Sequence, residues 1–180
     1  MKKIITSFSQ WDHAELPLGN NPRLFTQLGG NWCAQCSEAN LVTEMLHAPF
    51  YPTTLNCLRL KSKGFVERNP EEGWEGDEII WSRINRFLPI KTEAILWNKE
   101  RGHVPLSLIK FPAVLSVDGS ARVGYQSHFV YARSGVYEGK KLVNIEIYDP
   151  YYDRHFLLYP HYDKGGLIKT VYSIINYELT

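Results

Sequence analysis

The chain has 180 residues, the size of a single domain, and 44% of them are hydrophobic, which is enough for a substantial core. Lys and Arg together number 20 against 19 Asp and Glu, so the formal charge of +1 gives no electrostatic basis for binding nucleic acid. No apolar run approaches the roughly 18 residues that a membrane span needs. We therefore expect a globular protein, most simply a monomer, that acts on neither nucleic acids nor membranes.

The first ten residues have a basic start but lack the apolar stretch of a signal peptide. The sequence as written therefore predicts a cytoplasmic protein, or one exported by a specialised secretion route. Its aromatic content of 13% favours an antiparallel sheet or an extended binding groove.

The first half of the chain carries mostly helical signals. Apolar residues recur at helical spacing over 39–46, and prolines follow at 49 and 52. A second helix is predicted over 77–87, and a short third one over 92–99. The stretch 67–78 holds six acidic residues and one arginine, and it is expected to be a solvated loop, with a charge filter for substrate as the alternative.

The second half of the chain carries β signals. Alternating or continuous apolar runs predict strands over 112–117, 128–132, 142–148, 156–159 and 167–177. Gly135 and Gly139 are expected to separate the second of these strands from the third.

The two halves together predict an α+β fold in a single domain. We expect a helical lobe over about 20–105 and an antiparallel β lobe over about 106–180, with a cleft between them.

Three cysteines, an odd number, argue against a disulfide framework and for a thiol with chemistry of its own. A Gly-Gly-Asn turn at 29–31 brings Cys33 to the first turn of the first helix. Unpaired backbone N–H groups and the helix dipole favour a thiolate there, and the thiolate is the nucleophilic form. Gln27 lies six residues upstream, so its side-chain amide and the Cys33 N–H form a candidate pair of donors for an oxyanion.

A thiolate nucleophile needs a base, and His128 is the best placed of six histidines because it begins an alternating strand. Asp149 ends the neighbouring predicted strand, where a carboxylate can accept the second N–H of the imidazole and fix its orientation. His161 is the nearest rival to His128, but it follows Asp149 and no strand-end carboxylate comes after it.

Several motifs occur in an order that resembles the papain-like cysteine peptidases, and most closely the staphopains and related bacterial effector peptidases. Trp32-Cys33-Ala34 is similar to their nucleophile segment, and Ser127-His128 to the start of their histidine strand. Ile147–Tyr151 resembles their aromatic-Asn-Pro-Trp segment with Asp in place of Asn, and Val171–Tyr177 resembles their closing strand. The resemblance is weak over 51–111.

This resemblance implies a papain-like fold and a thiol hydrolase that needs neither a cofactor nor a metal. It implies Cys33 as nucleophile, His128 as base, Asp149 as the residue that orients it and Gln27 as oxyanion donor. Tyr151 would stand where the family has a tryptophan that shields the histidine. The expected partner is a protein or peptide substrate, and an inhibitor or immunity protein is a further expectation.

Trp32 has two interpretations, since its side chain is expected either to line the substrate groove or to cap the core. The same triad also suits a protein deamidase or transglutaminase of the toxin or effector type. A binding module with a decayed triad is another alternative.

The cysteines themselves allow two other interpretations. Cys33 and Cys36 have the spacing of a thioredoxin-type redox site, although no buried strand precedes them. A zinc site would combine Cys33, Cys36 and Cys57 with His47 or His103, without the second ligand pair that makes such a pattern specific. We expect Cys36 and Cys57 to be packing residues.

Overall fold

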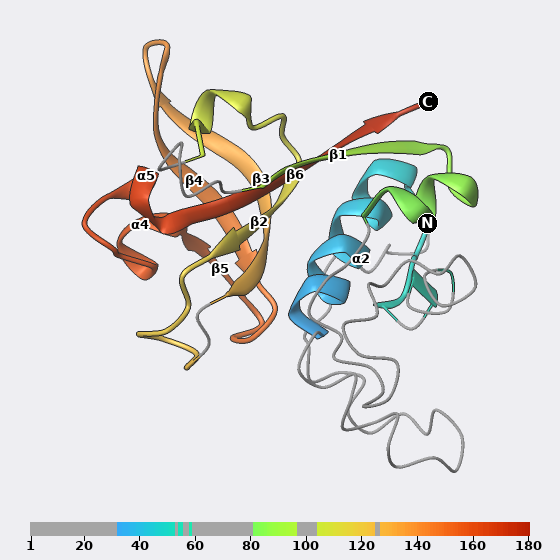
Figure 1. Ribbon diagram of the computed structural model, residues 1–180, viewed down its shortest axis with the longest axis horizontal. Coiled ribbons are helices and arrows are strands. Elements are labelled where there is room, and N and C mark those ends of the chain that lie inside the picture. Colours follow the sequence, from blue (N-terminus) through green and yellow to red (C-terminus); the bar gives the residue numbers. More distant parts are fainter. Residues whose placement is uncertain (1–31, 53, 56–57, 59–80, 97–103, 125–126) are drawn as a thin grey trace.

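A computed structural model describes residues 32–52, 54–55, 58, 81–96, 104–124 and 127–180 (Figure 1). In this part of the chain, helix α2 (Trp32–Leu46) packs against a six-stranded antiparallel sheet. The predicted α+β class is therefore confirmed. The strands follow the order β1-β6-β2-β3-β4-β5, and their bounds are β1 (Ile90–Leu96), β2 (Ala113–Val117), β3 (His128–Glu138), β4 (Lys141–Asp149), β5 (Arg154–Leu157) and β6 (Val171–Leu179).

Short helical segments also occur between these elements in the described ranges. They are the 3-10 helices η1 (Trp81–Arg86) and η2 (Leu106–Leu108), and the four-residue helices α4 (Leu158–His161) and α5 (Leu167–Thr170). In the described part of the chain, no helix is long and apolar enough to cross a membrane.

Strand β6 is an interior strand of the sheet, because β1 pairs with it on one side and β2 on the other (Figure 1). The β3–β4 hairpin turns at Gly139, whose φ of 61° lies in the left-handed region that glycine adopts without strain. The hairpin therefore has two ends, with His128 and Asp149 at one and the Gly139 turn at the other.

Successive side chains of each strand point to opposite faces of the sheet, and the core is accordingly divided in two. In β3, Tyr131 joins an apolar cluster with α2, whereas Val130 and Ala132 join a second cluster on the other side. The first cluster includes Cys36, Ala39 and Val42 together with further residues of the helix and sheet. Helix α2 is buried along 33–43, so the packing of its apolar residues holds it on the sheet.

Polar contacts also fix α2 against the sheet. The Tyr177 hydroxyl of β6 donates to Glu38 Oε1 over 2.6 Å, and Glu38 has no exposed surface. The Ser37 hydroxyl donates to the Phe129 carbonyl over 3.1 Å. The Tyr131 hydroxyl donates to the carboxylate of Glu44, near the end of the helix. Because a buried carboxylate is costly without a donor, these contacts set the position of the helix along the sheet.

The first predicted helix is confirmed by α2, but the third is wrong. Residues 90–96 form strand β1 and pair with β6 from Ile90↔Leu179 to Leu96↔Ser173. The segment Ile-Lys-Thr-Glu-Ala-Ile-Leu contains good helix formers, and pairing with a strand some 80 residues later in the chain overrides that local preference. The second helix was predicted over 77–87, and of its described residues 81–86 form the 3-10 helix η1.

Three other boundaries differ from the prediction. Gly135 lies inside β3 rather than between two strands, so the strand continues to Glu138. The predicted strand over 156–159 begins earlier, as β5, and ends at Leu157. The last predicted strand begins only at Val171, because 167–170 form the short helix α5.

Removing the hydroxyl of Tyr177 tests the polar link between helix and sheet. We expect Tyr177→Phe to lower the free energy of unfolding by about 2 kcal/mol, since it deprives a buried carboxylate of a charge-assisted hydrogen bond. Tyr137→Phe, at an exposed position of β3, is the matched control and should change the stability by less than about 0.5 kcal/mol. Urea unfolding followed by circular dichroism measures both, and equal stabilities of the two variants would contradict the assignment.

Candidate active site

His128 and Asp149 meet at the open end of the β3–β4 hairpin. His128 is the first residue of β3 and Asp149 the last of β4. Tyr131 pairs with Tyr148, which places Asp149 opposite Val130 and on the same face as His128, its diagonal neighbour. The His128 Nε2 lies 2.8 Å from Asp149 Oδ1, and both side chains are almost completely buried.

Asp149 is the centre of a hydrogen-bond network. Besides the His128 ring, the Tyr151 backbone N–H donates to its Oδ1 over 2.9 Å, and the Tyr162 hydroxyl donates to its Oδ2. Burial opposes ionisation of Asp149, but the bonds from His128, Tyr162 and the Tyr151 N–H outweigh it and hold the pKa of this carboxyl below its ordinary value. Asp149 is therefore a carboxylate at neutral pH.

Cys33 lies within hydrogen-bonding reach of the His128 side chain. Because Asp149 occupies Nε2, the ring nitrogen left for the thiol is Nδ1. Burial lowers the pKa of His128, but the bond to Asp149 and the interactions with Cys33 outweigh this effect and raise it to about 9. At neutral pH the structure thus places a positively charged imidazolium between a buried carboxylate and a thiol.

The second residue of α2 is Cys33, which is only 9% exposed. One turn later on the helix, Ser37 is bonded to the backbone of β3, the strand that carries His128. The first turn of a helix leaves its backbone N–H groups without intrahelical partners, so the Cys33 N–H belongs to the donors that such a turn presents. The packing of α2 on the sheet is what brings the thiol to the histidine.

The other predicted site residues are placed only in part. Tyr151 is half-buried, and its ring meets that of His128 edge-on at 88°, with 6.3 Å between the centroids. Trp32 is the first residue of α2. Gln27 lies outside the described residues. The structure therefore brings together Cys33, His128, Asp149 and Tyr151.

Two further residues contact Asp149 without having been predicted for the site. Tyr162 is buried, and burial together with the neighbouring carboxylate raises the pKa of its hydroxyl, so it remains a donor. His161 Nε2 lies 3.4 Å from Asp149 Oδ2, and its ring stacks on Phe156 with 3.8 Å between the centroids. Burial lowers the pKa of His161, which keeps this ring neutral at neutral pH in spite of the carboxylate.

Of Tyr162 and His161, only His161 could be recognised from the sequence as a candidate for the site. His161 was visible as the nearest rival of His128, and it shares the same carboxylate in the structure. Tyr162 follows Asp149 by 13 residues and belongs to no motif, so only the chain path through β5 and α4 brings its hydroxyl to the site.

The redox-pair and zinc-site interpretations of the cysteines can be compared with the described residues. Cys33 and Cys36 are not joined by a disulfide, and Cys36 is completely buried in the cluster between α2 and the sheet. Within the described ranges, no three His, Cys, Asp or Glu side chains are grouped so that they could hold a metal ion. Cys57 and His103, which the zinc hypothesis needs, lie outside those ranges.

With this geometry in hand, we compared the chain with protein-family models, with curated proteins and with solved structures, and no match was found in any of the three.

Titration of His128 tests the site without any substrate. We expect its ring to lose its proton near pH 9, and to do so at lower pH in Asp149→Asn and in Cys33→Ala, since both partners favour the charged ring. Nitrogen-15 NMR of the imidazole measures this. Glu146→Gln removes an exposed carboxylate from the same strand and should leave the titration unchanged. A His128 that titrates near 6.5 in the parent protein would contradict the arrangement.

Proposed function

We propose that the protein is a cysteine peptidase with a Cys33–His128–Asp149 triad. The observation that carries this proposal is the line of contacts from the thiol through the charged imidazole to a buried carboxylate. A nucleophile paired with a base, which a third group orients, is the arrangement that acyl transfer by a thiol requires. A papain-like arrangement of a helical lobe and a β lobe, with the substrate in a cleft between them, belongs to the proposal.

The reaction proceeds in two halves. Cys33 Sγ attacks the carbonyl carbon of an amide, and the C–N bond breaks as His128 gives its proton to the leaving amine. The resulting thioester is then hydrolysed when the neutral His128 takes a proton from water, whose oxygen attacks the carbon and releases Sγ. The Cys33 N–H and the side chain of Gln27 stabilise the oxyanion that forms in each half.

The contacts of Asp149 support a positioning role. Its Oδ1 accepts from Nε2, which directs Nδ1 toward the thiol and fixes the rotation of the ring. The carboxylate is itself held by Tyr162, a donor that stays protonated. His161 is neutral, so it is not a second cation that competes with His128 for the Asp149 carboxylate. Tyr162 is therefore proposed as a positioning residue that acts through Asp149.

Tyr151 is proposed to shield the His128–Asp149 pair, because its ring covers the edge of the imidazole and its N–H binds the carboxylate. Trp32 is proposed as a wall of the substrate groove. The substrate is a protein or peptide, and the chemistry needs no metal or organic cofactor.

Selective labelling of Cys33 tests the proposed reactivity. We expect iodoacetamide at about pH 6, and the epoxide inhibitor E-64, to modify Cys33 and to spare Cys36, because Cys33 is the thiol beside the His128 imidazole whereas Cys36 is completely buried in the core. Mass spectrometry of the digested protein identifies the modified residue. Cys33→Ala should abolish both labelling and cleavage of fluorophore-labelled casein.

Matched variants separate the proposal from its rivals. Cys36→Ala should retain labelling and cleavage, and equal loss in Cys36→Ala and Cys33→Ala would instead favour a redox pair. If labelling occurs but added amine is incorporated into the substrate in place of hydrolysis, the triad serves a transferase. If Cys33 reacts no faster than a free cysteine in solution, the catalytic proposal is wrong.

The role of Tyr162 is open to a sharper test than loss of activity. We expect Tyr162→Phe to lower kcat about tenfold, which corresponds to about 1.4 kcal/mol for a lost bond to a charged group. Without that donor the pKa of Asp149 rises, so the acidic limb of the pH–rate profile should move to higher pH. Tyr172→Phe, which breaks a similar bond to Asp118 elsewhere, is the matched control and should leave the limb in place.

A further inference from the structure

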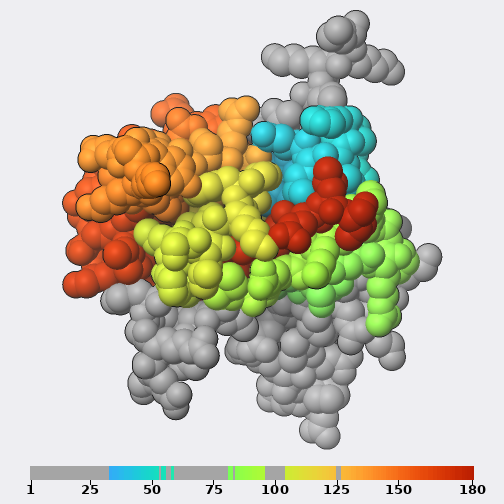
Figure 2. Space-filling model, turned by 90° about the horizontal axis from the view of Figure 1, so that it is seen from above, coloured from blue at the N-terminus to red at the C-terminus, as the bar shows by residue number. Residues whose placement is uncertain are grey.

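A second feature of the surface lies at the other end of the β3–β4 hairpin from His128. A cavity of about 1080 Å³ lies there, lined by the η2 segment, the hairpin turn and the α5 segment. The surfaces of these parts of the chain adjoin one another in Figure 2. Strand β3 runs for 11 residues from His128 to Glu138, so at a rise of about 3.3 Å per residue the hairpin-turn side of the groove lies roughly 30 Å from His128. Its α5 side comes closer, because Thr170 at the end of α5 donates to the Tyr162 carbonyl. None of the lining residues belongs to the proposed active site.

The charged side chains that line the groove in the described part of the chain are all lysines, namely Lys140, Lys141 and Lys169. Lys110 and Lys164 elsewhere have acidic partners, at 2.5 Å from Glu178 and 3.0 Å from Asp118. The three groove lysines form no ion pair within the described residues, and Glu138, opposite Lys141 in the hairpin, is the one carboxylate beside them in the register. Three cations against one carboxylate leave the groove with a net positive charge.

The floor and walls of the groove are apolar. Leu106, Leu142 and Leu167 contribute to it, and they pack against the core cluster on this side of the sheet. Ile168 and Tyr137 also line it, and they are 55% and 54% exposed. Large apolar side chains left this exposed beside a concavity are typical of a surface that a ligand covers.

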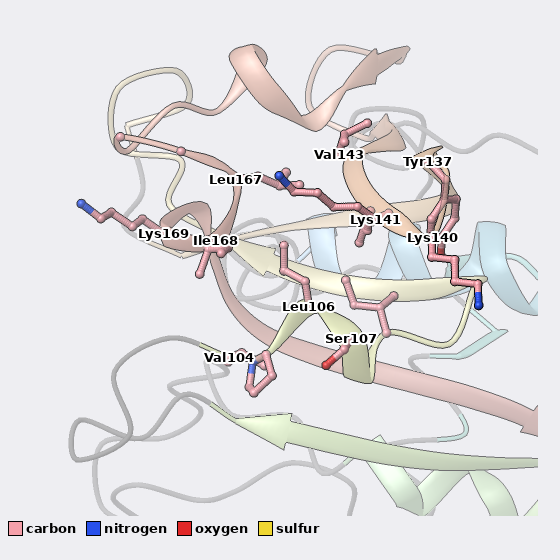
Figure 3. Close-up of a pocket in the computed structure, with 15 residues that line it drawn as sticks. Val104, Leu106, Ser107, Tyr137, Lys140, Lys141, Val143, Leu167, Ile168 and Lys169 are labelled. Atoms are coloured by element: carbon pink, nitrogen blue, oxygen red, sulfur yellow. The ribbon is translucent and has the colours of Figure 1, made fainter.

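The arrangement of the charges gives the groove a direction. In Figure 3, Lys169 and Lys140 extend from opposite sides of the groove, and Lys141 reaches across it toward Leu167. Cations are thus spread along an apolar channel instead of converging on one point. A single small anion would meet one of them, whereas an extended ligand with several negative groups meets all three.

We propose that this groove is a docking site for an acidic peptide segment of a partner protein, with aliphatic side chains between its carboxylates. The carboxylates pair with the lysines at the rim, and the aliphatic groups cover Ile168 and the leucines below it. A concave channel suits an extended chain better than a membrane surface. Three cations are also too few for the basic stripe that nucleic acid binding uses. This inference stands independently of the proposed peptidase activity.

Binding of a defined peptide tests the proposal. The probe is a fluorescein-labelled peptide of alternating Glu and Leu residues, and the readout is fluorescence anisotropy with the Cys33→Ala protein, which rules out cleavage. We expect Lys141→Glu to weaken binding at least about tenfold, and binding to weaken as salt screens the charges. Lys91→Glu makes the same change of charge on β1, outside the groove, and should bind as the parent does.

The apolar contribution has its own control. Ile168→Ser removes an exposed apolar group and should weaken binding of the Glu–Leu peptide, but not the residual binding of a Glu–Ser peptide of equal charge. If Lys141→Glu and Lys91→Glu weakened peptide binding equally, the effect would come from the net charge of the protein and not from the groove. That result would overturn the proposal. The absence of binding at about 1 mM peptide would also overturn the proposal. A third contrary result would be binding to phosphatidylserine vesicles that depends on Lys141, with no binding to the peptide.

Discussion

The packing of α2 against the sheet is the constraint on which the candidate site depends. Cys33 belongs to the helix and His128 to β3, so their contact exists only while the two elements keep one position. Apolar burial alone would permit the helix to slide, because it is not directional. Glu38 removes that freedom, since its buried carboxylate must stay beside the Tyr177 hydroxyl of β6. A polar contact deep in the core thereby sets the distance between thiol and imidazole at the end of the helix.

The second constraint is electrostatic. Asp149 has no exposed surface, and a buried carboxylate is retained only where donors replace its water. Two side chains and one backbone N–H do so, and they come from β3, from the residue that follows α4 and from the residues that follow β4. Each donor also restricts a neighbour: the bond from Tyr162 fixes the carboxylate, and the carboxylate fixes the ring of His128. The charged imidazole that results lies beside the Cys33 thiol, a group that an adjacent cation can assist as a nucleophile.

Local patterns in the sequence were sufficient for α2 and for most strands of the second half, because the helical and period-two spacings are properties of neighbouring residues. They also placed His128 and Asp149 at facing strand ends, which the hairpin confirms. Strand β1 was misread as a helix, since its state depends on a partner strand far along the chain. Tyr162 could not be found for a related reason. Its hydroxyl reaches Asp149 only through the path of β5 and α4, and no spacing rule records that path.

A formal charge of +1 also conceals how the charges are distributed. Asp149 is completely buried and lies against the charged ring of His128, so the two charges largely cancel outside the protein. Lys140, Lys141 and Lys169 form no ion pair with any residue that the structure describes, and all three line one groove. A near-neutral composition therefore excludes an extended basic face, but it does not exclude a local cationic site of the size of a peptide. The charges of Asp149 and His128 therefore act on each other inside the protein, whereas the groove lysines are left to act on whatever approaches from solution.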